Sequence, residues 1–371
     1  MSEFVIIGGG VYGAATAFWL SEQGREVTLL ERRKIGNGAS AGPGRRGTRA
    51  NGRDVRELPL VRLAHEMWPD LHQRLDAEPF FERLGHLLLI EREEDMASCK
   101  ARALMQNSMG TETHVLGAGE VREREPDVCE DVIAALYCPL DGVSDHTAVT
   151  DAFAVAAQRR GADIRLDTGV SRIEVTGGEA LAVITEAQDR IKIGQTLLVL
   201  ANAGVQELLS DHVTLPVWSR AFQVMLTNPL DPMPLNHLIG HVSRTLALKA
   251  EAGNRIMISG GYPGRWNAAA ETGTAVQTSV DANFADAVAV YPCLEGIGIE
   301  LADADHLESL SVDDIPVIDT VPGAENTIYA AAWCGHGWAI APSVTQMLAE
   351  WAVSGERPPL LAPFTHKRFG I

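Results

Sequence analysis

The sequence predicts an α/β fold whose first element is a buried parallel strand. The run Phe4–Ile7 is wholly apolar, as expected of a strand that is covered on both faces of a sheet. A helical stretch over residues 14–23 follows and stops at Gly24, and a second apolar strand covers Val27–Leu30. The chain therefore begins with a strand–helix–strand unit, and such units build parallel sheets.

The turn between the first strand and the helix carries the pattern Gly8-x-Gly10-x-x-Gly13. Gly8 permits the tight turn, Gly10 lets a pyrophosphate approach the backbone, and Gly13 lets helix and strand pack closely. The second strand ends in Glu31, about twenty residues further on, where a carboxylate can accept hydrogen bonds from a ribose. These features predict a dinucleotide site; the alternative is an ordinary strand–helix–strand unit without a nucleotide.

Length, composition and charge limit the possible classes of protein. The 371 residues allow two or three domains, and 46% hydrophobic with 22% charged residues is typical of a globular protein. No apolar run is long enough to span a membrane and no signal segment is visible, so we expect a cytoplasmic protein. The net charge of −18 argues against partners such as nucleic acid or anionic membranes. Five cysteines without C-x-x-C spacing predict neither a metal site nor a disulfide framework.

The segment after Glu31 differs from that of a generic nucleotide-binding dehydrogenase. Residues 32–54 lack apolar periodicity and are rich in small residues, which predicts a long loop whose backbone lies against a large ligand. Residues 45–56 contain five arginines, Arg45, Arg46, Arg49, Arg53 and Arg56. They form either a solvated basic loop or a group that faces phosphates, a bound cofactor or an anionic substrate.

The rest of the chain alternates between segments of the nucleotide-binding domain and segments of a second domain. Strands are predicted over 188–193 and 196–201, and the second of these ends in Asn202-Ala203-Gly204, which suggests a return to the first sheet. A glycine-rich loop near residue 335 precedes a predicted final helix over 342–353. The predicted nucleotide-binding domain comprises residues 1–60, 140–215 and 311–371, and a second domain comprises residues 61–139 and 216–310.

These landmarks together resemble the D-amino-acid oxidase superfamily of flavoproteins, particularly its glycine oxidase and sarcosine oxidase branch, over nearly the whole chain. The matching motifs are the Gly8–Gly13 turn with Ala17, Glu31, Gly36-Asn37-Gly38-Ala39-Ser40, Ala201-Asn202-Ala203-Gly204, Asp313-Asp314-Ile315-Pro316, and Gly335-His336-Gly337-Trp338 with Ala341-Pro342. The resemblance implies a Rossmann-like FAD-binding domain that is interleaved with a substrate domain built on a mostly antiparallel sheet.

The resemblance also implies FAD in an extended conformation. The first glycine turn would approach the pyrophosphate, Glu31 the adenosine ribose, and Val170 the adenine, while the late glycine loop would lie against the flavin ring and stabilise negative charge on it. The expected FAD contacts are Gly8, Gly10, Val11, Tyr12, Gly13, Glu31, Arg32, Arg33, Gly38, Ala39, Ser40, Arg45, Arg46, Val170, Ala201, Gly204, Gly335, His336, Gly337, Trp338 and Ala339. We expect FAD to be held noncovalently, with a linkage through His306 as the alternative.

The chain leaves the family pattern where relatives bind the substrate carboxylate. By position, Glu308 replaces the usual arginine, Ala339 replaces a lysine of the sarcosine oxidase branch, and His306 stands where that branch attaches flavin to cysteine. Because a carboxylate needs a cationic partner, we expect Arg49 and Lys249 to replace the missing arginine and lysine as the clamp that binds the substrate carboxylate. The alternative is that they form ordinary ion pairs. Glu308 would then be a counter-charge for an amine. The candidate catalytic residues are Arg49, Lys249, His306, Glu308 and His336, whose ring either acts or only packs.

The function implied by the resemblance is FAD-dependent oxidation of the C–N bond of a small amine or amino acid, of the secondary-amine, glycine, sarcosine or D-amino-acid type. Hydride equivalents pass to flavin N5, and water hydrolyses the resulting imine. Dioxygen or a protein takes the electrons, because similar chains also occur as subunits of heteromeric sarcosine, proline and opine-type dehydrogenases; a homo- or hetero-oligomer is therefore expected. The alternatives are oxidation of a hydroxy acid on the same scaffold and a flavin-binding protein without turnover. NAD in place of FAD would leave the loops Gly36–Gly47 and Gly335–Gly337 without a purpose.

Overall fold

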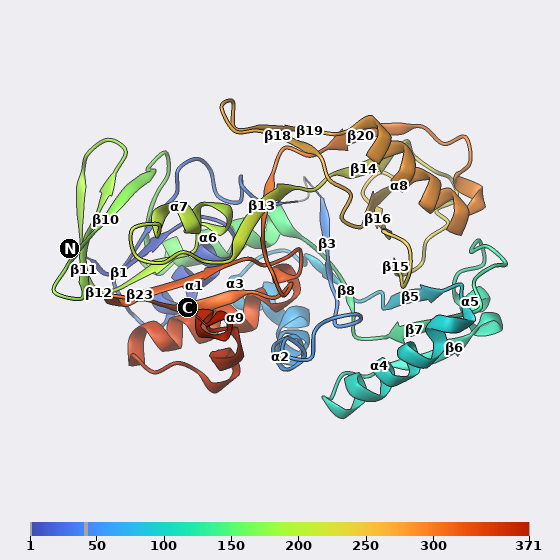
Figure 1. The fold of residues 1–371 in the computed structure, drawn as a ribbon, viewed down its shortest axis with the longest axis horizontal. Coiled ribbons are helices and arrows are strands. Elements are labelled where there is room, and N and C mark those ends of the chain that lie inside the picture. The colour runs from blue at the N-terminus through green and yellow to red at the C-terminus, as the bar shows by residue number, and fades with distance from the viewer. Residues whose placement is uncertain (1, 41–43, 371) are drawn as a thin grey trace.

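The computed structural model describes residues 2–40 and 44–370, and its two large sheets lie at opposite ends of the molecule (Figure 1). Within the described residues the first sheet has eight strands and lies near both chain ends. Its strand β1 (Ser2–Ile7) pairs in parallel with β2 (Val27–Leu30) and with β12 (Arg190–Val199). The other strands are β9 (Asp163–Arg165), β10 (Val170–Thr176), β11 (Glu179–Thr185), β22 (Val317–Val321) and β23 (Ala324–Ala331).

Helices cover both faces of the first sheet. Helix α1 (Val11–Glu22) is almost entirely buried, which its apolar sequence allows, and it packs against α6 (His146–Arg159) and α9 (Gly337–Ser354). The short helix α7 (Val205–Leu208) lies over the other face, where its Val205 joins the core around Val5. Further helices are α2 (Leu58–Met67), α3 (Leu71–Leu75), α4 (Met96–Ser108) and α5 (Ala118–Arg124).

The second sheet also has eight described strands and is antiparallel except for one parallel pair, β5 with β15. Helix α8 (Gln277–Val290) packs on it over an apolar core. Its strands are β5 (His86–Ile90), β6 (His114–Gly117), β7 (Ala134–Cys138), β14 (Val224–Thr227), β15 (Leu238–His241), β16 (Ala247–Glu251), β17 (Arg255–Ser259) and β20 (Ile299–Asp303). The predicted fold class, an α/β sheet combined with a mostly antiparallel one, is confirmed; the domain division itself stays a prediction.

Smaller sheets connect the two large ones. Strand β3 (Arg45–Thr48) pairs with β8 (Gly142–Asp145), which also pairs with β4 (Phe81–Glu82), and Figure 1 shows β3 and β8 between the large sheets. Two further pairs are β13 (Val217–Ala221) with β21 (Leu307–Ser311) and the hairpin β18 (Arg265–Asn267) with β19 (Thr272–Thr274). No helix in the described part of the chain is both long and apolar enough to cross a membrane.

Two segments differ from the sequence-based expectation in their strands. The predicted loop over residues 32–54 contains strand β3, which no apolar alternation marks because cross-strand hydrogen bonds to β8 stabilise it. The two strands expected over 188–193 and 196–201 are one strand, β12. Gly194 does not interrupt this strand; a Cβ there would lie 2.9 Å from the Ser2 carbonyl oxygen, so the glycine allows β1 to approach.

The final helix also differs from its expected bounds. It was expected to begin at Pro342, because proline is favoured in the first turn of a helix. Helix α9 instead begins at Gly337 and runs to Ser354, with Pro342 inside it. The late glycine loop is therefore joined directly to the first turn of α9, which places the unpaired N–H groups of the helix N-terminus at that loop.

The β1–α1 turn leads to a prediction about stability. A Cβ at Gly13 would lie 1.8 Å from the Gly8 carbonyl oxygen, so Gly13→Ala must displace backbone and is expected to lower the free energy of unfolding by about 1–3 kcal/mol. Gly10→Ala is the matched control: its Cβ would meet no atom within 4 Å, so we expect a change within about 0.5 kcal/mol. Urea unfolding without added ligand measures both. Equal stability of the two variants would contradict the close contact.

Candidate functional site

A cavity of about 820 Å³ opens at the carboxyl ends of β1, β2 and β12. Parallel sheets bind ligands at this edge, because strand-to-helix turns expose backbone N–H groups there. The cavity continues past Gly335 to Phe222, Trp266 and Glu308. Its volume lies in the usual range for ligand sites, about 300–1,000 Å³.

The β1–α1 turn builds one end of this cavity. Gly8 has a φ angle of +107°, which favours glycine, and the backbone at Gly10 is open because an added Cβ would touch nothing. The Glu31 carboxylate lies at the same end. It accepts hydrogen bonds from the backbone N–H groups of Gly9, at 2.6 Å, and Arg33, at 2.7 Å. These bonds fix the carboxylate at the cavity wall, where it suits a ribose.

The first turn is tied to the late glycine loop across the cavity. The Tyr12 hydroxyl donates a hydrogen bond to the Gly337 carbonyl oxygen at 2.6 Å, and the Tyr12 ring stacks on Trp333 with 3.6 Å between ring centroids. The Trp338 indole N–H donates to the Ser144 hydroxyl at 2.7 Å. Two helix N-termini, those of α1 and α9, are thereby held at the wall of one cavity, and both favour negative charge.

Glu308 is a buried carboxylate at the other end of the cavity. Its residue is 3% exposed, the Ser40 hydroxyl donates to Oε2, and Oε1 has no hydrogen-bond partner among the described residues. Burial raises the pKa of Glu308, although the bond from Ser40 partly offsets this effect. A buried acid with a raised pKa in a cavity wall is typical of a proton-transfer or charge-recognition site.

Buried cations lie near the same end. Arg46 lines the cavity and donates to the Ser40 carbonyl oxygen at 2.9 Å, and burial lowers its pKa to about 10. Lys249 lies on β16 and is 6% exposed. Burial, together with the charge of Arg46, lowers the pKa of Lys249 to about 7, although Glu251 opposes this shift. Lys249 can therefore gain or lose its proton near neutral pH.

A buried network supports the late loop from behind. Arg53 and Glu57 form an ion pair of 3.1 Å, with side chains 1% and 0% exposed. Arg53 also donates to the His336 carbonyl oxygen at 2.6 Å, while the His336 ring lies 3.5 Å from Glu57. Burial lowers the pKa of His336, and it lowers that of the adjacent Arg49 to about 10. The His336 ring thus faces Glu57, and its loop is held by a buried arginine.

Most of the expected site residues line the one cavity. Those that do are Gly8, Gly10, Val11, Tyr12, Glu31, Arg32, Arg33, Gly38, Ala39, Ser40, Arg46, Val170, Ala201, Gly204, His306, Glu308, Gly335, Gly337 and Trp338. Those that lie outside its wall are Gly13, Arg45, Arg49, Lys249, His336 and Ala339. Gly13 packs on Gly8, and the Ala339 carbonyl oxygen accepts a bond from Trp68. The Arg45 side chain pairs with Glu82 at 2.9 Å.

Two acidic residues of the site were not expected from the sequence. Glu57 follows Arg53 by four residues, but both precede helix α2, which begins at Leu58, so the helical spacing rule for opposite charges does not apply to this pair. Glu271 belongs to the turn of the β18–β19 hairpin and lines the cavity. It pairs with Arg32 at 2.6 Å and with Arg33 at 2.7 Å, so the hairpin contacts the nucleotide end. No local pattern indicates such a contact.

Comparison with known proteins identifies the family. The sequence matches the DAO family, described as FAD dependent oxidoreductase, over residues 3–351. Sarcosine oxidase subunit beta of Arthrobacter sp is 25% identical over 99% of this chain and 91% of that protein. Glycine oxidase of Geobacillus kaustophilus is 24% identical over 99% and 97%. The solved structure of L-proline dehydrogenase from P. horikoshii has a TM-score of 0.88 and 25% identity, covering 100% of this chain and 98% of that one.

The site fits the cofactor that defines this family. The open backbone at Gly10, the two helix N-termini and the fixed Glu31 carboxylate are the donors and acceptor that a dinucleotide needs. The predictions of the family, of the enzyme class and of FAD as cofactor are confirmed. The chain belongs to the DAO family of FAD-dependent oxidoreductases, whose members include amine and amino-acid oxidases.

Proposed function

We propose that this chain oxidises the C–N bond of a small amine or amino acid. FAD, when bound, supplies the hydride acceptor. The observation that carries the proposal is a group of opposite charges at one end of the cavity: Glu308 and Arg46 line it beside Ser40, and Lys249 lies near Arg46 outside the wall. An amino acid has both charges, so such a site can hold its ammonium and carboxylate groups at once.

Each buried group then has a defined task. Glu308 attracts the substrate ammonium and accepts its proton, which leaves the neutral amine that can give up hydride. Lys249, with Arg46 and Arg49, attracts the substrate carboxylate. These cations would take the place of the arginine and lysine that this chain lacks at positions 308 and 339. The Arg53–Glu57 pair acts indirectly, because it positions the His336 backbone.

The cofactor-binding roles follow from the cavity wall. We infer that the Gly8–Tyr12 turn and the N-terminus of α1 hold the pyrophosphate, that Glu31 holds the ribose, and that the Gly335–Trp338 loop holds the ring. Noncovalent binding and a cytoplasmic location stay predictions. His306 lines the cavity and keeps the covalent alternative open.

A second candidate is the flavin subunit of a heteromeric dehydrogenase. It is favoured by the similarity to a protein named as a beta subunit, which this chain matches over 91% of that protein's length. In that case electrons leave FAD for a partner subunit rather than for dioxygen.

The function is tested by anaerobic bleaching of the FAD-loaded protein. We expect glycine, sarcosine, proline or a D-amino acid to reduce the flavin, and lactate or glycolate to leave it oxidised. Bleaching by the hydroxy acids alone would contradict C–N oxidation, and the absence of bleaching by any compound would indicate a binding protein. Air is then admitted. Rapid return of the oxidised spectrum supports an oxidase, whereas very slow return supports the heteromeric dehydrogenase.

Lys249 gives the site a predicted pH dependence. Its pKa is lowered to about 7, so its positive charge is present below pH 7 and is lost as the pH rises through that value. Binding of benzoate, detected by the shift it causes in the flavin absorption spectrum, should weaken about tenfold between pH 6 and pH 8. Lys249→Met should remove this slope. A slope that survives in Lys249→Met would assign the effect to the charge of Glu308 and contradict the role of Lys249.

A further inference from the structure

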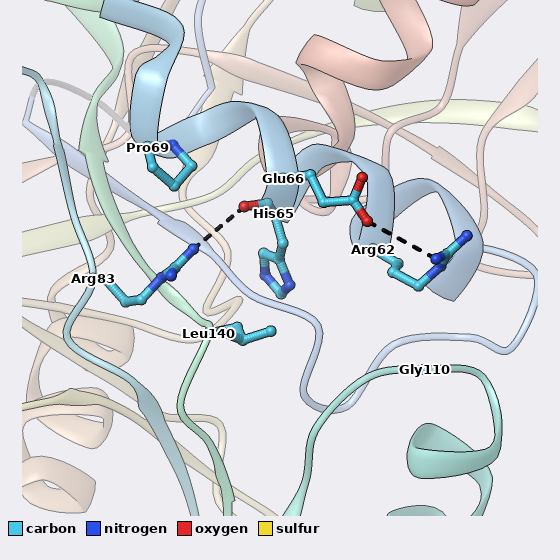
Figure 2. Close-up of a pocket in the computed structure, with 7 residues that line it drawn as sticks. All are labelled: Arg62, His65, Glu66, Pro69, Arg83, Gly110 and Leu140. Atoms are coloured by element: carbon cyan, nitrogen blue, oxygen red, sulfur yellow. Dashed lines mark hydrogen bonds and ion pairs between the residues drawn. The ribbon is translucent and has the colours of Figure 1, made fainter.

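A second cavity, of about 480 Å³, lies beside helix α2 and shares no lining residue with the FAD cavity. Figure 2 shows the His65 ring hanging from α2, with Arg83 on one side, Arg62 on the other and Leu140 below. The full lining is Arg62, His65, Glu66, Pro69, Arg83, Gly110 and Leu140. Its volume is sufficient for a small organic molecule.

The two arginines of this cavity have few bonds of their own. Arg83 donates a single hydrogen bond, of 3.3 Å, to the His65 carbonyl oxygen, and among the described residues no carboxylate lies within ion-pair distance of it. Arg62 approaches Glu66 only to 3.9 Å, beyond hydrogen-bond distance. By contrast, Arg74, one helix further on, pairs with Glu22 at 2.8 Å. Among the described residues Arg62 is therefore only loosely paired and Arg83 has no carboxylate partner, and in a chain of net charge −18 two such guanidinium groups around one cavity favour an anionic ligand.

Buried contacts hold the floor of the cavity, and the rest of the wall is part acidic, at Glu66, and part apolar. His65 is 5% exposed, and its Nε2 atom lies 3.2 Å from Asp141, a carboxylate with no exposed surface. Asp141 also accepts bonds from the backbone N–H groups of Ala50, at 2.7 Å, and Asn51, at 3.2 Å. The Asp141 carboxylate therefore contacts both the His65 ring and two backbone N–H groups. Pro69 and Leu140 supply the apolar wall.

We propose that the α2 cavity binds a small organic carboxylate. Its charged end pairs with Arg62 and Arg83, whose planar guanidinium groups match a carboxylate, and its apolar end lies on Pro69 and Leu140. A ligand there contacts His65. The His65 ring lies against the Asp141 carboxylate, which accepts the backbone N–H of Ala50, the residue next to Arg49. The proposal does not depend on the reaction at the FAD site.

The probe is benzoate, titrated calorimetrically into the FAD-loaded protein while flavin absorption is recorded. We expect two binding events: one that shifts the flavin spectrum, and one that releases heat without a spectral change. Arg62→Ala/Arg83→Ala should weaken the silent event at least tenfold and leave the spectral event unchanged. Arg74→Ala, which removes an exposed arginine paired with Glu22, is the matched control and should change neither.

Several results would overturn the proposal. The first is that the only binding event is the one that shifts the flavin spectrum, and the second is a silent event that is as strong in Arg62→Ala/Arg83→Ala as in the wild type. Inorganic phosphate that binds more tightly than benzoate would contradict the apolar-carboxylate assignment. Because the altered arginines are exposed, thermal unfolding of the variants should match that of the wild type, which separates lost binding from lost folding. Failure here leaves the spectral event, and with it the proposed function, unaffected.

Discussion

The structure depends on a backbone contact that leaves no room for side chains. A Cβ at Gly13 would collide with the Gly8 carbonyl oxygen, and a Cβ at Gly8 would lie 2.6 Å from the Leu200 carbonyl oxygen at the end of β12. The end of β1, the first turn of α1 and the end of β12 therefore contact one another through backbone atoms. This contact directs the N-terminus of α1 into the cavity, and the bond from Tyr12 to Gly337 fixes the N-terminus of α9 relative to it. The FAD site is thus shaped by backbone before any side chain contributes.

The opposite end of the cavity is shaped by buried charge. Glu308 lines the cavity, whereas Lys249 and Arg49 lie outside its wall, and burial shifts the pKa of each of the three toward its neutral form. Charged groups cost free energy when they leave water, and this cost is the basis for proposing that the group recognises a charged ligand. The Arg53–Glu57 pair differs, because its opposite charges contact each other directly and Arg53 also holds the His336 backbone. The first three residues suit recognition of a charged ligand, whereas the Arg53–Glu57 pair suits positioning of the loop at His336.

Short-range patterns in the sequence brought the glycine turn and Glu31 together, and both line the same end of the cavity. The glycine turn and Glu31 lie within one strand–helix–strand unit, so their spacing alone describes their geometry. The charged end could be predicted only in part, because it joins segments that are far apart in the chain: Glu308 meets Ser40, and Glu271 meets Arg32. The α2 cavity had no sequence signal at all, since Arg62 and Arg83 become neighbours only through folding. The sequence also did not predict that β12 continues through Gly194 or that α9 begins at Gly337.

The central claim is that the glycine turn and the late loop form one FAD site. The most direct test is the titration of FAD into cofactor-free protein, followed by quenching of flavin fluorescence with ADP as competitor. The account predicts one FAD per chain, displacement by ADP, and binding at least about tenfold weaker in Gly10→Ala, because a methyl group would then stand between the pyrophosphate and the backbone. A protein that binds no FAD, or a Gly10→Ala variant that binds it as tightly as the wild type, would contradict the account.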